Sequence, residues 1–228
     1  MVRTAGSRLG KKRARVEKKA RFLVVTEGAV TEPSYFERLR SHLETEFAAT
    51  FTIRPKISGA SKGTGKNWNP NPNAVVEHCI KLLEEDRKKH RKGSDVEPYA
   101  AAFAVVDVDH YAQQTKNEGL SQLHRALRTA QSGDVDVIVS NNKFEVWLLW
   151  HFMENINIAE QCITDQCIKN KILIGRNAKT LSPSFPVEEY RIAAIRADKK
   201  SHLEIGKIGH FPATAMPRFF EIVAQKSK

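Results

Sequence analysis

Three acidic residues follow two apolar segments of the chain, and they are the first candidates for chemistry. Glu27 comes shortly after residues 22–25, and Asp107 and Asp109 come directly after residues 101–106. Short apolar runs rich in β-branched residues predict buried strands. Because the carboxyl ends of parallel strands meet at one edge of a sheet, we expect the three carboxylates to share a cleft.

Carboxylate oxygens are hard ligands that suit Mg²⁺ or Mn²⁺ better than zinc. In an extended segment, residues two apart point the same way, so Asp107 and Asp109 are expected to face one metal ion. A divalent ion beside a carboxylate base is the usual equipment for phosphodiester hydrolysis. Two plainer interpretations stand beside this one. An Asp-x-Asp pair is common as a loop cap, and Glu27 can equally be a surface residue of a strand–helix loop.

The segment around Glu27 predicts a strand, a tight turn and a helix. Gly28 follows the carboxylate, Thr31 is a suitable N-cap residue and Pro33 suits the first helical turn. From there the spacing of four apolar residues predicts one buried helical face, formed by Tyr35, Phe36, Leu39 and Leu43.

The same rhythm continues along the chain. Further strands are predicted at 50–58, 101–106 and 135–140, with helices at 73–92, at 119–130 and after residue 141. Alternating strands and helices predict right-handed crossovers and a parallel α/β sheet of about four strands. Beyond residue 154 the signals weaken. Helices are predicted at 158–174, at 187–197 and near the C-terminus, with a loop at 177–186.

The formal net charge of +11 is concentrated at the N-terminus, where residues 1–21 hold nine Lys or Arg and one acid. A basic arm suggests contact with the phosphates of a nucleic acid, and the alternative is a solvated tail. A second basic candidate is the Gly-, Asn- and Pro-rich segment 59–74, which lacks the spacing of a P-loop. The candidate phosphate contacts in these two segments are Lys11, Lys12, Arg13, Arg15, Lys62 and Lys66.

These signals predict three regions: a basic arm at 1–20, an α/β core at 21–155, and a mostly helical extension packed on it at 156–228. Cys79, Cys162 and Cys167 have neither disulfide-framework nor zinc-finger spacing. No apolar run approaches the length of a membrane span, and no signal-peptide pattern follows the N-terminus. We therefore expect a reduced, cytoplasmic protein.

Three motifs resemble the RloB-like family of phage-defence proteins, within the wider group of Toprim domains. They are VVTEGAVTEPSYFERL at 24–39, AVVDVDHY at 104–111 and VSNNKFEVWLLWHF at 139–152, with a looser match in PATAMPRFFEIV at 212–223. The Asn142–Lys143 pair departs from the family, which more often has Pro and a small residue there.

The resemblance implies a Toprim-like (Rossmann-like) fold and a Mg²⁺- or Mn²⁺-dependent nuclease acting on RNA, tRNA included, or on DNA. It implies Glu27 as general base or metal ligand, and Asp107 and Asp109 as metal ligands. Ser140, Asn141 and Glu145 follow the fourth strand and are expected to complete the site, although Glu145 can instead cap its own helix. Lys199 and Lys200 are candidates for neutralising transition-state charge.

In related defence systems such a subunit works beside an ABC-type ATPase that holds or releases it. The resemblance thus implies an ATPase partner, and a homo-oligomer is also open. The rival hypothesis is a non-catalytic subunit with a Toprim-like fold, which binds nucleic acid or the partner and uses its carboxylates for a structural ion or for none.

Overall fold

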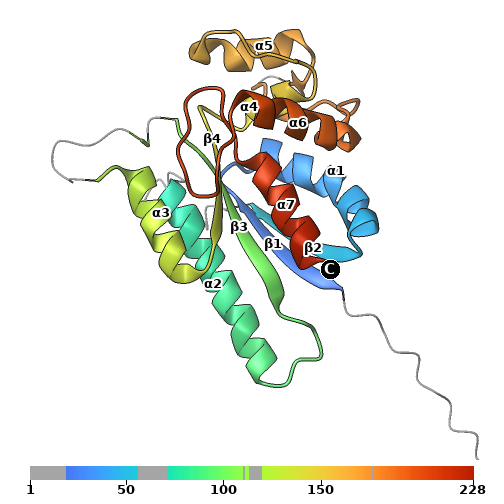
Figure 1. The fold of residues 1–228 in the computed structure, drawn as a ribbon, viewed down its shortest axis with the longest axis vertical. Coiled ribbons are helices and arrows are strands. Elements are labelled where there is room, and N and C mark those ends of the chain that lie inside the picture. The colour runs from blue at the N-terminus through green and yellow to red at the C-terminus, as the bar shows by residue number, and fades with distance from the viewer. Residues whose placement is uncertain (1–18, 56–70, 110, 113–119, 176) are drawn as a thin grey trace, which may run out of the picture.

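The computed structural model describes residues 19–55, 71–109, 111–112, 120–175 and 177–228. Its centre is a four-stranded, all-parallel sheet with strand order β2-β1-β3-β4 (Figure 1). The strands are β1 (Ala20–Thr26), β2 (Ala49–Pro55), β3 (Tyr99–Asp107) and β4 (Asp136–Ser140). The predicted α/β class, the parallel sheet and the four strands are confirmed.

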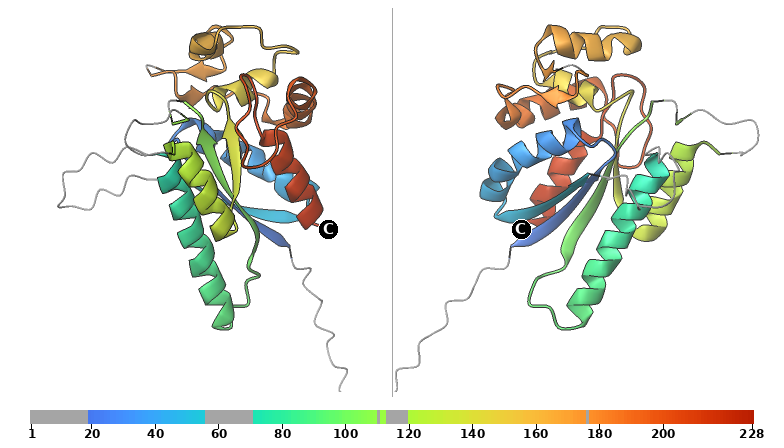
Figure 2. Two further views of the ribbon diagram at one scale, coloured as in Figure 1. Left: turned by 60° about the vertical axis from the view of Figure 1, so that its left-hand side comes forward. Right: turned by 180° about the vertical axis from the view of Figure 1, so that it is seen from behind.

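Helices cover both faces of the sheet (Figures 1 and 2). One face carries α1 (Thr31–Glu46) and α7 (Met216–Lys226), and the other carries α2 (Pro72–Arg91) and α3 (Gln122–Gly133). Beyond the carboxyl ends of the strands lie the shorter helices α4 (Glu145–Trp150), α5 (Ile163–Lys169) and α6 (Tyr190–Lys200). Two 3-10 turns, η1 (Glu160–Cys162) and η2 (Val187–Glu189), precede α5 and α6.

The C-terminal region departs from its prediction in one respect. A small antiparallel pair, β5 (Leu173–Ile174) and β6 (Thr180–Leu181), forms where the sequence indicated a helix and a loop. Each strand has only two residues, too few for any periodicity to show in the sequence. The prediction of one continuous helix over 158–174 is therefore wrong, because η1, the seven residues of α5 and β5 divide that segment.

Alternating residues of the central strands fill two separate cores. Phe22 and Val24 pack on the α1 side, and Leu23 and Val25 pack on the α2 side. All four are at most 1% exposed, as expected for strands buried on both faces of a parallel sheet. On the α1 side, α7 is anchored by Phe219, whose ring centroid lies 4.8 Å from that of Phe103. Burying each such ring contributes roughly 2–3 kcal/mol.

The start of α1 differs from the expectation. The N-cap position is Val30, which makes no side-chain capping bond, and Thr31 is already the first helical residue. The Thr31 hydroxyl instead donates a 2.8 Å hydrogen bond to the backbone oxygen of Lys179. This bond ties the beginning of α1 to the loop before β6, although the two are far apart in the sequence.

The order of the strands places a topological switch point at the carboxyl ends of β1 and β3. The chain leaves β1 through α1 on one face of the sheet and leaves β3 through α3 on the other face. The two strands are neighbours, with Thr26 beside Val105, so their onward connections diverge at the carboxyl edge. In open α/β sheets, ligands bind at this kind of topological switch point.

The segment between α6 and α7 covers the outer edge of β4. Gly206 N–H donates to Val137 O, Ala215 N–H donates to Val139 O, and Thr214 forms an antiparallel bridge with Ser140. An edge strand covered in this way is protected from pairing with other chains. None of the helices in the described part of the chain has both the length and the apolar character needed to cross a membrane.

Candidate active site at the carboxyl edge of the sheet

Glu27 stands at this switch point, one residue beyond the end of β1. Its backbone N–H donates to Val105 O at 3.1 Å, which extends the ladder by one residue beyond β1. Its Oε2 accepts a 3.2 Å hydrogen bond from the backbone N–H of Asp107. Burial raises the pKa of Glu27 to about 7, and the nearby carboxylates of Glu32 and Asp109 add to the rise. This carboxyl can therefore exchange a proton near neutral pH.

Glu32 is a further acid of the site, and the sequence prediction missed it. It is the second residue of α1 and is only 6% exposed. Its Oε1 accepts a 3.1 Å bond from the backbone N–H of Gly28. Burial raises its pKa to about 7, with a contribution from Glu145, while the Gly28 bond and Lys179 act in the opposite direction. A helix-starting acid five residues after Glu27 was visible in the sequence, but on its own it indicates only a favourable dipole contact.

The absence of a side chain at Gly28 is what makes room for Glu32. A Cβ built at Gly28 would lie 2.0 Å from Oε2 of Glu32, far inside contact distance. A side chain at position 28 would therefore have to displace the Glu32 carboxylate. Thr26 holds the same turn through a 2.9 Å hydrogen bond from its hydroxyl to Gly28 O.

Asp107, the last residue of β3, has the least compensated carboxylate of the group. Its Oδ1 is buried and has no hydrogen-bond partner among the residues that the structure describes. Burial raises the pKa of Asp107 well above its ordinary value, and Glu32, Glu145 and Glu27 raise it further, against one lowering bond from the Phe144 backbone. A buried, unpaired carboxylate oxygen is costly unless a cation or proton satisfies it.

Asp109 lies at the exposed rim of the same site. β3 ends at Asp107, and Asp109 sits in a turn with a φ of 35°, so strand alternation no longer sets its direction. Its backbone N–H donates to Asn142 O at 3.0 Å. The Asp109 carboxylate raises the pKa of Glu27 and of Glu145, which places it beside both. Tyr111 is another neighbour: burial raises the pKa of its hydroxyl, and Glu27, Asp109 and Asp107 add to the rise.

Glu145 begins α4 and closes the cluster from the side of β4. Burial raises its pKa, its own backbone N–H and two lysines, Lys143 and Lys179, lower it, and Asp109 raises it. Glu145 therefore joins the acids from the first residue of α4. Lys143 lies in the turn after β4. Lys179 is held near the site by the hydrogen bond from the Thr31 hydroxyl to its backbone oxygen.

Ser140 and Asn141 lie next to the cluster but bond away from it. The Ser140 hydroxyl is fully buried and lies 2.8 Å from the Thr214 hydroxyl. Asn141 donates from Nδ2 to Gly209 O at 2.7 Å, and its Oδ1 is buried without a partner in the described part of the chain. Both residues thus fasten β4 to the segment before α7, and only the Asn141 oxygen remains for a ligand.

The donor set fits a hard divalent cation. Buried acids that raise one another's pKa, together with the orphaned Asp107 Oδ1, are what a cation would relieve. In the part of the chain that the structure describes, however, no group of three or more His, Cys, Asp or Glu is arranged to hold a metal ion. A partial set of protein ligands is consistent with Mg²⁺, because Mg²⁺ is usually held by one or two carboxylates together with waters and substrate phosphate.

The remaining predicted residues lie elsewhere. Lys199 and Lys200 are exposed at the C-terminal end of α6, whereas the lysines that act on the acids are Lys143 and Lys179. The residues proposed to contact nucleic acid lie outside the described part of the chain: Lys11, Lys12, Arg13, Arg15, Lys62 and Lys66.

The aromatic residues of α4 form core rather than a stacking platform. Trp147 and Trp150 are fully buried, and Trp150 Nε1 donates to Pro212 O at 3.3 Å. His151 lies beside Trp147 O and the Tyr35 hydroxyl, and burial lowers its pKa to about 4. It is thus a neutral, structural histidine. Phe152 differs from the others in being 45% exposed.

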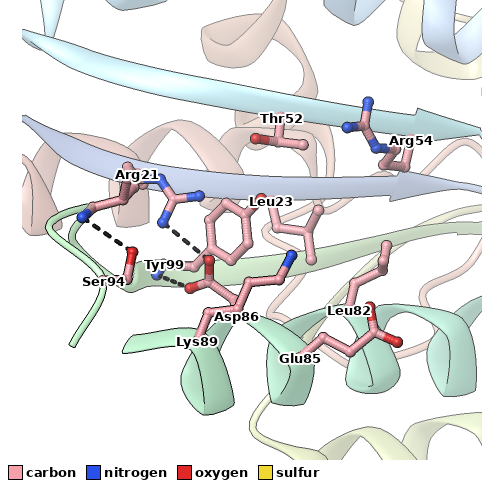
Figure 3. Close-up of a pocket in the computed structure, with 11 residues that line it drawn as sticks. Arg21, Leu23, Thr52, Arg54, Leu82, Glu85, Asp86, Lys89, Ser94 and Tyr99 are labelled. Atoms are coloured by element: carbon pink, nitrogen blue, oxygen red, sulfur yellow. Dashed lines mark hydrogen bonds and ion pairs between the residues drawn. The ribbon is translucent and has the colours of Figure 1, made fainter. Parts of the chain in front are cut away.

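A separate hollow of about 320 Å³ lies between α2 and the β1–β2 part of the sheet (Figure 3). There Arg21 donates to Asp86 at 3.0 Å, and its guanidinium lies 4.2 Å from the centre of the Tyr99 ring. The Asp86 carboxylate at the centre of this hollow is paired with the Arg21 guanidinium. It therefore differs from the uncompensated carboxylates at the carboxyl edge of the sheet.

A parallel α/β sheet with buried acids at its switch point defines a Rossmann-like domain with a polar site at the carboxyl edge. The family model described as RloB-like protein matches residues 22–222, which is most of the chain. The chain therefore belongs to the RloB-like family. Neither a curated protein nor a solved structure gives a match.

Proposed function

We propose that this protein is a metal-dependent nuclease that hydrolyses phosphodiester bonds in RNA or DNA. One observation carries the proposal above all: four buried or half-buried carboxylates converge at the switch point, and the Asp107 Oδ1 has no partner within the described ranges. Strongly perturbed carboxyl groups that gather in one place are typical of functional sites. Membership of the RloB-like family supports the same conclusion.

The roles of the residues follow from their surroundings. Asp107 and Glu145, with Glu32 behind them and Asp109 at the rim, would hold Mg²⁺ or Mn²⁺. When bound, the ion supplies Lewis-acid stabilisation of charge on the phosphate. Glu27 accepts and returns a proton, since a pKa of about 7 suits a general base at neutral pH.

Two lysines would act on the substrate rather than on the ion. Lys143 and Lys179 lie close enough to lower the pKa of Glu145. Fixed cations beside a phosphate stabilise the charge that develops in phosphoryl transfer. Lys179 is held by the Thr31 bond to its backbone, so α1 and the loop before β6 together position this charge.

We further propose that the chain is the effector of an anti-phage system and is controlled by an ABC-type ATPase. The support is family membership and a physical argument. A free nuclease of this kind would damage the host's own nucleic acid, so its activity needs a partner that restrains it.

The test is cleavage by the full chain of total RNA and plasmid DNA, in Mg²⁺, Mn²⁺ or EDTA. Glu27→Gln is the active-site variant. Glu37→Gln is its matched control, because Glu37 is an exposed acid on α1. We expect metal-dependent cutting that Glu27→Gln abolishes and Glu37→Gln preserves. If cutting persists in Glu27→Gln, the assigned site is wrong.

The rival function is a non-catalytic subunit, and one observation favours it: the described residues contain no ready-made three-ligand metal group. Repeating the assay with the candidate ATPase and ATP separates the two functions. Cutting that appears only with the partner and is lost in Glu27→Gln supports the nuclease. Nucleic-acid binding without cutting under every condition supports the rival.

A further inference from the structure

Helix α6 exposes two isoleucines to solvent. Its inner face is formed by Tyr190, Ala193 and Ala197, which are buried. On the outer face, Ile192 is 45% exposed and Ile195 is 69% exposed, the highest value among the large hydrophobic residues that the structure describes. In Figure 2, α6 lies at the periphery of the molecule. An apolar pair at this spacing is not needed for the core and calls for another explanation.

The isoleucines belong to a regular pattern that we call the α6 stripe. Its four members are Glu188, Ile192, Ile195 and Lys199, and all four are exposed. Their spacing of four, three and four residues places them on one side of the helix, with Glu188 in the turn that leads into α6. Neither Glu188 nor Lys199 forms an ion pair with any other residue that the structure describes.

The α6 stripe is complementary to a second copy of itself that runs in the opposite direction. If two copies of α6 lie antiparallel, Ile192 of each faces Ile195 of the other, and Glu188 of each faces Lys199 of the other. Opposite charges at both ends and an apolar centre are the arrangement of a symmetric helix pair.

An apolar groove beside the stripe gives the contact more area. It lies between α6 and α7, has a volume of about 390 Å³, and is lined by Ala194, Ile195, Pro217, Phe220 and Ala224 among others. The stripe itself spans about 16 Å, since a helix rises roughly 1.5 Å per residue. Side chains of a second copy can therefore be buried on both α6 and the groove.

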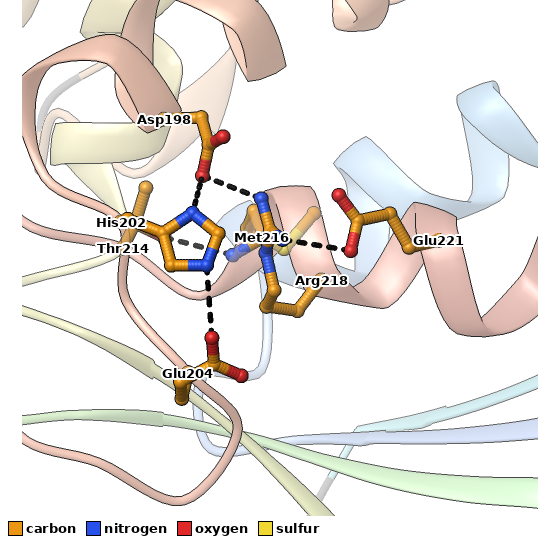
Figure 4. A network of polar contacts seen from close by, with 7 residues as sticks. All are labelled: Asp198, His202, Glu204, Thr214, Met216, Arg218 and Glu221. Atoms are coloured by element: carbon orange, nitrogen blue, oxygen red, sulfur yellow. Dashed lines mark hydrogen bonds and ion pairs between the residues drawn. The ribbon is translucent and has the colours of Figure 1, made fainter.

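The end of α6 is held rigidly, so the stripe is preformed. Arg218 at the start of α7 bonds both Asp198 and Glu221, the latter at 2.8 Å (Figure 4). His202, just past the helix, lies 3.0 Å from Asp198 and 2.9 Å from Glu204. A surface that needs no ordering on binding loses little of its binding free energy to entropy.

We propose that a second copy of this chain packs on the α6 stripe, in an antiparallel two-fold pair. The occupant is a second copy because the pattern matches its own reverse in both charge and apolarity. This proposal is independent of the nuclease function, since the stripe contains none of the clustered acids.

The first test is sedimentation velocity of the full chain over a range of concentrations. The disrupting variant is Ile195→Asp. The matched control is Ile168→Asp, because Ile168 is also an exposed isoleucine, 46% exposed, but lies on α5. We expect a dimer for the wild type and for Ile168→Asp. Ile195→Asp should raise the dissociation constant at least about tenfold, as loss of a central interface anchor does.

The second test uses charge reversal. Its outcome does not require that any single substitution leave the rest of the protein undisturbed, because the double variant serves as the internal control. Glu188→Lys and Lys199→Glu should each weaken the dimer, because each sets like charges opposite one another twice. The double variant restores opposite charges and should recover the wild-type dissociation constant.

Three outcomes would overturn the proposal. A monomeric wild type would leave the stripe to a different protein. A dimer that is insensitive to Ile195→Asp would use another surface. A double reversal no better than the single variants would exclude the antiparallel register. Thermal unfolding of every variant verifies that all are folded.

Discussion

Two acids at opposite ends of the sheet, Asp86 and Asp107, differ in how fully the surrounding residues satisfy their carboxylate oxygens. Asp86, on α2, accepts 3.0 Å hydrogen bonds from Arg21 and from the Tyr99 backbone, so both of its oxygens are satisfied. Asp107, at the end of β3, has one buried oxygen that bonds to none of the described residues. The first acid lies among donors and a cation, and the second lies among other acids.

The difference separates a structural carboxylate from a functional one. Matched charges hold the start of β1 and β3 to α2, whereas uncompensated charges are tolerated only where something outside the chain completes them. Because strain of this kind lowers stability, a fold keeps it where function requires it. The acids at the carboxyl edge are therefore expected to control activity, and Asp86 to control stability.

The largest effect is expected on activity, from removal of the proton acceptor. Glu27→Gln keeps the shape of the side chain and its bond from the Asp107 N–H, but it no longer accepts a proton. We expect nucleic-acid cleavage to fall by about a thousandfold, with the free energy of unfolding unchanged or higher. Initial cleavage rates and urea unfolding measure the two quantities. A variant that loses activity only because it unfolds would erase the contrast with Asp86.

The next effect concerns pH. Burial raises the pKa of Glu27 and of Glu32 from 4.5 to about 7, so the folded chain binds more protons than the unfolded chain between those values. The stability of the metal-free protein should therefore be highest below pH 4.5 from this source and fall as pH rises to 7. The total change is on the order of several kcal/mol.

A divalent cation should reverse that loss. We expect Mg²⁺ to raise the melting temperature more at pH 8 than at pH 5, because the cation competes with protons for the same carboxylates. Thermal unfolding in EDTA and in Mg²⁺, across pH 4.5 to 8, measures both trends. A stability that increases between pH 5 and 7 in EDTA, or a slope that persists in a Glu27→Gln/Glu32→Gln double variant, would contradict this interpretation.

A smaller effect is expected at the matched acid. Asp86→Ala leaves Arg21 and the Tyr99 N–H without their acceptor, and should lower the free energy of unfolding by about 2 kcal/mol. Cleavage per folded molecule should stay at the wild-type level. Asp107→Asn is the counterpart, with lost activity and undiminished stability. If both variants lose stability equally, the two acids do not differ in role.

The smallest effect tests the space at Gly28. A Cβ there would collide with the Glu32 carboxylate, so Gly28→Ala should reduce cleavage by about tenfold, a change of about 1.4 kcal/mol. The same substitution should have much less effect in a Glu32→Ala background, where the carboxylate is absent. Equal effects in both backgrounds would show that Gly28 serves the backbone rather than Glu32.

Much of this fold was predictable from periodicity. The apolar runs at β1 and β3 predicted two buried central strands. Their alternation with amphipathic helices predicted a parallel sheet, and therefore a common edge for Glu27 and Asp107. The order β2-β1-β3-β4 was not predictable, because no local pattern says which strands become neighbours. That order makes β1 and β3 neighbours, so that the acids at their carboxyl ends lie in one site.

The site was only partly predictable for the same reason. Glu27 and the two aspartates stand beside clear strands, whereas Glu32 is one acid among many at helix starts. Lys179 lies in a loop 148 residues from Thr31, the residue that anchors it, and no spacing rule connects them. The short β5–β6 pair and the turn at Asp109 likewise depend on tertiary contacts.

The most direct measurement is Mn²⁺ binding by calorimetry to the metal-free protein at pH 7.5, for the wild type, Asp107→Asn and Asp86→Asn. Binding by the wild type and Asp86→Asn, with loss in Asp107→Asn, is the predicted result. No binding by the wild type, or binding that Asp107→Asn leaves intact, would contradict the assignment of the carboxyl-edge acids as a cation site.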